Sequence, residues 1–376
     1  MYSFWEKDHW FRYVDVAIVG GGLLGMWTAL ELKKRQPALD VLVVEKSCRT
    51  QGASSRNAGF ACFGSPGELL HDARTMGVEQ MLSVVEMRLQ GIEKIRKTFK
   101  ASSIDYEPCG GYECFTSNYE VVREALPELN AWLKPVVRNA ETFKVSTNAL
   151  EGFGLHFNGM VSTSMESAIH SGKLTEELYL LAHSLGVRFL YGIPVTHWES
   201  GHPAILHLGS AELKAGKIIF CTNAWLSHFF PELHIKPARG QILLTKVLSV
   251  LPLRGTFHFD DGFYYWRHLN GRILLGGARN SDFEGEETHE LNISDHIQNM
   301  LEAFLKQHFP GYAAELSAAD AIAQRWSGLM AMTADKRPLI KETASNILAA
   351  CCCNGMGVAL SPVFGEKIAD RVLTTG

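Results

Sequence analysis

The chain has 376 residues, of which 46% are hydrophobic and 20% are charged. This length fits two or three domains, and the large apolar fraction excludes a globally disordered protein. The 36 Lys and Arg residues are balanced by 40 Asp and Glu residues, for a net charge of −4. We therefore expect no nucleic-acid partner on the basis of overall charge.

The longest nearly apolar run covers residues 16–30 and contains four glycines. It is shorter than the roughly 20 apolar residues that a transmembrane helix needs. The residues before it mix aromatic and charged side chains and lack the apolar stretch of a secretory signal. These features predict a cytoplasmic protein with no membrane span.

The first predicted element is a buried strand over 14–19, and three spaced glycines follow it. Apolar residues then recur at helical spacing from Leu23 to Leu30. A GxGxxG pattern between a strand and a helix is typical of dinucleotide binding. Gly20 permits the tight turn, Gly22 allows the backbone to approach a pyrophosphate, and Gly25 lets the helix pack closely on the strand.

A second apolar strand over 41–44 ends at Glu45, about 20 residues after the glycines. An acid at this distance accepts hydrogen bonds from a ribose and disfavours a 2′-phosphate. No second GxGxxG pattern occurs in the chain. The sequence therefore predicts one dinucleotide site and gives no support for a separate NAD(P)H site.

The segment 51–60, QGASSRNAGF, is rich in small residues and hydroxyls that expose backbone N–H groups to an anion. Together with the glycine turn, it resembles the D-amino-acid-oxidase-like family of FAD-dependent oxidoreductases, which includes glycine oxidase and sarcosine oxidase. Further matches are Val195, the stretch 217–225, Pro237–Leu243 and the loop Asn354–Pro362 near the C-terminus.

The resemblance implies FAD as the cofactor. Members with a covalent flavin carry cysteine or histidine at positions that correspond to Gly328 and Arg56 here, so we expect non-covalent FAD. The expected cofactor-binding residues are Gly20, Gly22, Leu23, Leu24, Gly25, Glu45, Lys46, Ser54, Ser55, Arg56, Asn57, Ala58, Gly59, Val195, Thr222, Asn223, Trp225, Gly328, Asn354, Gly355, Met356, Gly357 and Val358.

The expected fold class is α/β, with a Rossmann-like FAD-binding domain of the glutathione-reductase type. A second α+β substrate domain is built on an antiparallel sheet. The cofactor domain is expected at 13–76, 150–235 and 325–376, and the substrate domain at 77–149 and 236–324. Within the latter, Asn270-Gly271 predicts a hairpin turn between two strands.

Candidate substrate-facing residues lie on the strand 263–269. Alternation places Tyr265 and Arg267 on one face and Tyr264 on the other, and the resemblance to glycine oxidase favours Tyr264. Met330 stands where glycine oxidase has an arginine for the substrate carboxylate, which argues against glycine or sarcosine as substrate. The side chains of Arg56, Arg239 and Arg337 are other potential carboxylate partners.

The predicted reaction is oxidation of the C–N bond of an amine or amino acid by hydride transfer to flavin, giving an imine that hydrolyses. The flavin performs the difficult step, so no nucleophile or paired acid is needed. No histidine spacing indicates a metal site, and none is expected. The electron acceptor, molecular oxygen or another, and the oligomeric state stay open. Alternatives are a flavoprotein dehydrogenase of a hydroxy acid or alcohol, and a flavin-binding subunit of a larger redox complex.

Overall fold

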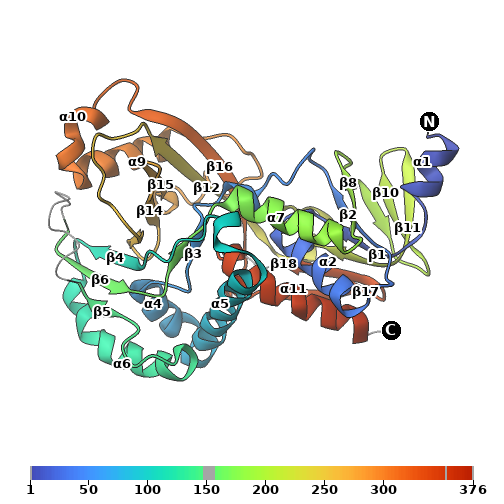
Figure 1. The fold of residues 1–376 in the computed structure, drawn as a ribbon, viewed down its shortest axis with the longest axis horizontal. Coiled ribbons are helices and arrows are strands. Elements are labelled where there is room, and N and C mark those ends of the chain that lie inside the picture. The colour runs from blue at the N-terminus through green and yellow to red at the C-terminus, as the bar shows by residue number, and fades with distance from the viewer. Residues whose placement is uncertain (1, 147–156, 352–353, 375–376) are drawn as a thin grey trace.

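The computed structural model describes residues 2–146, 157–351 and 354–374. It contains two large sheets that lie at opposite ends of the molecule, with helices packed around and between them (Figure 1). This is the mixed α/β architecture that the sequence predicts, with one mainly parallel and one mainly antiparallel sheet.

The first sheet has the strand order β17-β18-β11-β1-β2-β8, and the five strands from β18 to β8 pair in parallel. Its central strands are almost wholly apolar because both faces are covered. The hairpin of β9 and β10 extends it beside β11. Its strands are β1 (Val14–Val19), β2 (Val41–Glu45), β8 (Arg188–Tyr191), β9 (His197–Glu199), β10 (Ala204–Leu208), β11 (Ala211–Phe220), β17 (Leu339–Ala344) and β18 (Ile347–Cys351).

Three helices cover one face of this sheet and share an apolar core with it: α2 (Leu23–Arg35), α7 (Ser171–Ser184) and α11 (Gly357–Thr374). Helix α11 begins before Ser361, so Pro362 lies inside it and removes one backbone donor. A Cβ on Gly365 of α11 would lie 2.9 Å from backbone atoms of α2. This glycine therefore sets how closely the two helices pack.

The second sheet has the order β16-β12-β15-β14-β13-β4-β6-β5, and every pair is antiparallel except β13 with β4. Asn270 and Gly271 both have positive φ, as the predicted hairpin turn requires. The strands are β4 (Gly111–Phe115), β5 (Lys144–Val145), β6 (Gly159–Thr163), β12 (Lys236–Thr245), β13 (Thr256–Phe259), β14 (Tyr264–Leu269), β15 (Arg272–Gly277) and β16 (Ile322–Met332).

One face of the second sheet packs on α9 (Asp295–His308) and α10 (Ala313–Leu316). Helices α4 (Pro66–Met76), α5 (Val78–Thr98) and α6 (Tyr119–Val137) form a further core with strands β4 and β6. Strand pairing places β6 and β16 in this sheet, although the expected domain boundaries assign β6 and residues 325–332 of β16 to the cofactor domain. Those boundaries stay predictions.

Short elements connect the two halves. Strand β3 (Phe60–Ala61) pairs with β7 (Ser167–Ala168) between the two large sheets (Figure 1). The remaining helices are α1 (Phe4–His9), α3 (Ala53–Arg56) and α8 (Leu226–Phe229), with short 3-10 turns such as η2 (Asn223–Trp225).

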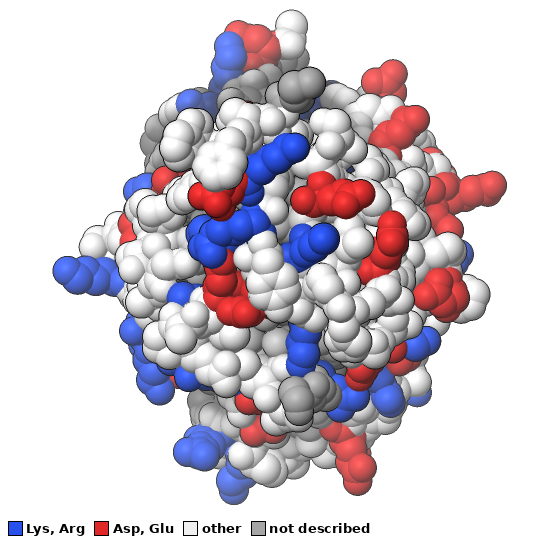
Figure 2. Space-filling view, turned by 90° about the vertical axis from the view of Figure 1, so that its right-hand side faces the viewer, with Lys and Arg blue, Asp and Glu red and all other residues white. Residues whose placement is uncertain are grey.

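Within the described residues, no helix combines the length and apolar character needed to cross a bilayer. On the face at the right-hand end of Figure 1, basic and acidic side chains are interspersed (Figure 2).

Candidate cofactor and substrate site

The glycine turn sits between β1 and α2, at the carboxyl edge of the parallel sheet. Gly20 has φ +109°, and a Cβ on it would lie 2.5 Å from the carbonyl oxygen of Cys221. A Cβ on Gly25 would lie only 2.0 Å from the carbonyl oxygen of Gly20. The tight turn and the close helix–strand packing that the sequence predicts are both present, and each depends on a missing side chain.

Glu45 ends the neighbouring strand and reaches back to this turn. Its carboxylate accepts a hydrogen bond from the backbone N–H of Gly21 at 2.8 Å and one from the N–H of Ser47 at 3.0 Å. The segment after β8 runs beside the end of β2, because the N–H of Ile193 donates a hydrogen bond to the carbonyl of Glu45. Val195 is two residues further on and packs on the apolar core of the sheet.

The small-residue segment folds as α3 against the start of α2. The hydroxyl of Ser54 accepts a hydrogen bond from the N–H of Leu23 at 2.9 Å, at the positive end of the helix dipole. Asn57 holds the segment through its side chain, whose Oδ1 accepts from the N–H of Gly59 and from the hydroxyl of Ser171. Ser54 is therefore brought to the glycine turn, and Asn57 ties the end of the segment to the start of α7.

The end of β11 completes this edge of the sheet. The hydroxyl oxygen of Thr222 is buried and has no hydrogen-bond partner among the residues that the structure describes. A buried hydroxyl without a partner is costly, and a cofactor atom at this edge would satisfy it. Beside it, the ammonium of Lys46 lies 3.5 Å from the ring centroid of Trp225, and burial lowers the pKa of this lysine. The residues present fit a bound dinucleotide.

Strand β16 contacts η2, and the C-terminal loop contacts β16 in turn. The side-chain amide of Asn223 donates to the carbonyl of Leu329 and accepts from the N–H of Ala331. The N–H of Asn354 in turn donates to the carbonyl of Ala331 at 2.8 Å. Asn354 and Gly355 of the predicted loop therefore reach the same strand as Gly328.

Met330 occupies a narrow place on this strand. A Cβ on Gly240 would lie 3.2 Å from its methyl carbon, and a Cβ on Gly355 would lie 3.5 Å from its sulfur. Its side chain thus lies between the crossing strand β12 and the C-terminal loop. Arg56 lies over Gly328, two residues along the same strand: a Cβ on Gly328 would lie 3.4 Å from the Cβ of Arg56, whose guanidinium donates to the carbonyl of Ser327 at 2.9 Å.

The two neighbouring tyrosines of β14 have different surroundings. Tyr264 stacks on Phe304 of α9 with ring centroids 4.6 Å apart and is buried in the core of the second sheet. Tyr265 faces the other way and lies 6.0 Å from the ring of Phe60, directly after the predicted cofactor segment. Tyr265 is therefore the better placed of the two for a substrate.

Arg267 shares the face of Tyr265 but is already engaged. Its guanidinium donates to the carbonyls of Gly59 and Ile169, both at 2.9 Å. Arg239 is engaged as well, in a buried two-point ion pair with Glu286 at 2.7 and 2.9 Å. These two guanidiniums hold the structure together, and neither is available as a simple carboxylate clamp.

The sequence did not single out Phe60, His258 or Glu113 as site residues. Cross-strand register places Tyr265, His258 and Glu113 in one row on three adjacent strands. The ring of Phe60 lies 5.4 Å from that of His258, and burial raises the pKa of Glu113 to about 7. Alternation along each strand predicts a face, but only the pairing shows which residues become neighbours.

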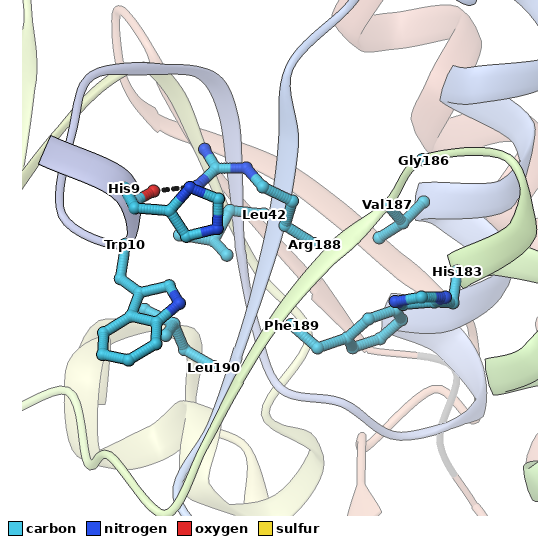
Figure 3. A pocket seen from close by; sticks show the side chains of 9 residues that line it. All are labelled: His9, Trp10, Leu42, His183, Gly186, Val187, Arg188, Phe189 and Leu190. Atoms are coloured by element: carbon cyan, nitrogen blue, oxygen red, sulfur yellow. Dashed lines mark hydrogen bonds between the residues drawn. The ribbon is translucent and has the colours of Figure 1, made fainter. Parts of the chain in front are cut away.

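Two surface cavities can be compared with this site. One of about 330 Å³ lies between the C-terminal end of α1 and strand β8 (Figure 3). None of the predicted site residues lines it, and the guanidinium of Arg188 there donates to the carbonyl of His9. The other, of about 380 Å³, is bordered by Ser55, Arg56 and three residues of β16. Only the second adjoins the predicted cofactor segment.

The model of the DAO family, described as FAD dependent oxidoreductase, matches residues 15–371. The chain is 25% identical over 378 residues to the bifunctional protein ThiO/ThiG of Trichormus variabilis, covering 96% of this chain and 52% of that protein. It thus spans about half the length of this relative. Gamma-glutamylputrescine oxidoreductase of Escherichia coli is 24% identical over 369 residues, covering 95% of this chain and 83% of that protein.

Among solved structures, glycine oxidase from Geobacillus kaustophilus superposes with a TM-score of 0.74 at 21% identity. The match covers 96% of this chain and 95% of that one, and it confirms the expected fold. Because the family model spans nearly the whole sequence, the chain belongs to the DAO family of FAD-dependent oxidoreductases.

Proposed function

We propose that this protein binds FAD non-covalently and oxidises the C–N bond of an amine or amino acid. The observation that carries the proposal is that two groups of residues lie next to each other. The glycine turn with Glu45 forms one part, and the row of Tyr265 and His258 under Phe60 forms the other. In this proposal the first part holds the cofactor and the second forms the substrate face.

FAD, when bound, supplies the redox chemistry by accepting a hydride equivalent from the carbon next to nitrogen. The residues of the chain then have simpler tasks. The backbone around Gly20–Gly25, with Ser54 and Thr222, would hold the pyrophosphate side of the cofactor, and Glu45 would hold the ribose. Phe60 and Tyr265 would position the amine and keep water away from the reacting carbon.

The nature of positions 56 and 328 supports non-covalent binding. Neither the guanidinium of Arg56 nor Gly328 offers a group that forms a bond to flavin, and Arg56 is held by the carbonyl of Ser327. An imine product would leave the protein or hydrolyse in water, and molecular oxygen or another acceptor would reoxidise the cofactor.

The names of two relatives support an amine as substrate, since one oxidises gamma-glutamylputrescine and another glycine. Met330 favours a substrate that has no carboxylate on the carbon bearing the reacting nitrogen, because a thioether cannot pair with an anion. Larger or uncharged amines therefore fit the proposal better than glycine.

Product analysis tests the reacting bond. The purified protein is incubated with amines, amino acids, hydroxy acids and alcohols, and each mixture is assayed for ammonia or a smaller amine and for a carbonyl product. Oxidation of a C–N bond releases a nitrogen product in equal amount to the carbonyl. Turnover of a hydroxy acid or alcohol with no nitrogen product would contradict the proposal and favour a dehydrogenase acting on C–O bonds.

A further inference from the structure

Cys62, Glu166 and His258 lie far apart in the sequence, yet their potential ligand atoms all lie within 4.8 Å of one another. We propose that these three side chains bind a divalent cation of the zinc type, with a fourth position left for water. Thiolate, imidazole and carboxylate are the donors that zinc takes in proteins, and a thiolate disfavours magnesium or calcium. The sequence showed no such site because its ligands have no short spacing.

Strand pairing builds the first half of the site. Strands β3 and β7 are antiparallel, with Phe60 opposite Ala168 and Ala61 opposite Ser167. The next pair in this register is Cys62 opposite Glu166, one residue beyond the ladder. The ladder that ends one residue earlier therefore brings the two ligands close together, independently of their side-chain contacts.

The carboxylate of Glu166 is held in place by groups around it. It is 1% exposed and accepts hydrogen bonds from the hydroxyl of Thr256 at 2.7 Å and from His258 Nε2 at 3.1 Å. A Cβ on Gly111 would lie 2.3 Å from the same carboxylate oxygen. The space for this oxygen exists because residue 111 is glycine, and Thr256 would keep orienting the carboxylate around a bound ion.

The distances suit a common ion after small movements. Zinc lies about 2.3 Å from sulfur and about 2.0–2.2 Å from nitrogen or oxygen, so tetrahedral donors lie roughly 3.3–3.8 Å apart. His258 Nε2 and Glu166 lie 3.1 Å apart, slightly closer than this range, and would separate by about 0.2 Å or more around an ion. The thiol of Cys62 would move by about 1 Å at most, within reach of a side-chain rotation. The ion would replace the hydrogen bond between His258 and Glu166.

The charges around the cluster favour a cation. Glu113 is the register neighbour of His258, and the nearby Glu68 forms an ion pair with Arg88 at 2.7 Å. Zinc binding would release the Cys62 thiol proton to solvent as the S–H bond is exchanged for S–Zn. The imidazole of His258 would bind through Nε2 as a neutral ring with its one proton on Nδ1, so the two positive charges would balance the thiolate and Glu166.

The ion would connect the predicted cofactor segment to the second sheet. Phe60 lies two residues before Cys62, and its ring contacts both His258 and Tyr265. An ion bound by both Cys62 and His258 would therefore hold the rings of Phe60, His258 and Tyr265 in place. This role does not depend on the identity of the substrate or on the proposed oxidation of amines.

Metal content tests the proposal. The purified full chain, with its flavin, is dialysed against Zn²⁺ and then against metal-free buffer, and zinc is measured by mass spectrometry. We expect about one zinc per chain in the unmodified protein and less than about one tenth in Cys62→Ser and His258→Gln. Cys109→Ser is the matched control, since Cys109 is a partly buried thiol outside the cluster, and it should keep the zinc.

Circular dichroism and thermal melting separate loss of the ion from loss of the fold. Added Zn²⁺ should raise the melting temperature of the unmodified protein and of Cys109→Ser, but not of the two ligand variants. Added Co²⁺ should give a thiolate-to-cobalt absorption in the difference spectrum of the unmodified protein. If the variants do not fold, the zinc content and the cobalt spectrum of the unmodified protein still test the proposal. Less than about one tenth of a zinc per chain or no cobalt absorption would overturn the proposal, as would equal zinc in folded ligand variants.

Discussion

The carboxylate of Glu45 accepts a hydrogen bond from the backbone N–H of Gly21 at 2.8 Å. These two residues come from adjacent parallel strands, whose carboxyl ends meet at one edge of the sheet. The contact joins the acid that ends the second strand to the glycine turn that ends the first. It places a negative charge where a ribose and a pyrophosphate would be bound together.

Replacing Glu45 with alanine should weaken FAD binding by about ten- to hundredfold, because one charge-assisted hydrogen bond is lost. The dissociation constant is measured by the fluorescence change of added FAD on apoprotein. The exposed Glu212→Ala, on β11 of the same sheet, serves as the control and should bind FAD normally. Equal affinity in both variants would contradict the assignment of Glu45.

Gly25→Ala should destabilise the fold by about 1–3 kcal/mol and reduce the flavin content of the purified protein. The new Cβ would lie 2.0 Å from the carbonyl oxygen of Gly20, and a backbone atom cannot move aside cheaply. Gly172→Ala, in the first turn of α7, meets only the ring of His170 and should have a small effect. Denaturant unfolding and the ratio of visible to ultraviolet absorption report the two quantities.

The paired tyrosines allow a matched test of the substrate face. Tyr265→Phe removes a hydroxyl from the face near Phe60 and should lower kcat/KM by about tenfold with little change in melting temperature. Tyr264→Phe removes the same group from the core near Phe304 and should leave kcat/KM unchanged. A larger loss of activity in Tyr264→Phe would show that the other face of β14 binds substrate.

Arg239→Met should cost about 3–5 kcal/mol of stability because the buried carboxylate of Glu286 loses its two-point partner. Adding Glu286→Gln should recover part of this loss, since the uncompensated charge is removed. Substrate preference should stay the same in the folded fraction. Unfolding in urea gives the stability, and a change of preferred substrate in Arg239→Met would argue for direct contact with substrate.

Met330→Arg should shift preference toward amines that carry a carboxylate, by at least about tenfold in the ratio of kcat/KM values. The side chain lies between Gly240 and Gly355, where a guanidinium would be close to the C-terminal loop. Met330→Gln is the control, because it is polar but cannot pair bidentately with an anion. A similar shift in both variants would indicate a change of shape rather than carboxylate recognition.

Much of the cofactor side could be predicted because its signals are local. The strand, the glycines and the helix adjoin in sequence, and Glu45 follows from the order of two parallel strands. The start of helix α11 is not a local signal of this kind, because the helix begins at Gly357, before Pro362, whereas proline is most common in the first turn of a helix. In the first turn of α11, the carbonyl of Ala359 packs against Gly91 of α5.

The substrate side depended on contacts between distant strands. Alternation separated Tyr264 from Tyr265 but could not tell which face α9 would cover. Likewise, nothing local to Glu166 shows that the pairing of β3 with β7 brings its side chain close to Cys62. Such pairings are decided by tertiary packing, which strand propensity alone does not specify.

The most direct test of the central claim is an anaerobic titration of the purified protein with a panel of amines and amino acids, followed by visible absorption. We predict a yellow protein whose FAD is released by denaturation and whose visible bands are bleached by an amine in stoichiometric amount. A colourless protein that takes up no added FAD would contradict cofactor binding at this site. A yellow protein that only a hydroxy acid or alcohol bleaches would contradict oxidation of the C–N bond.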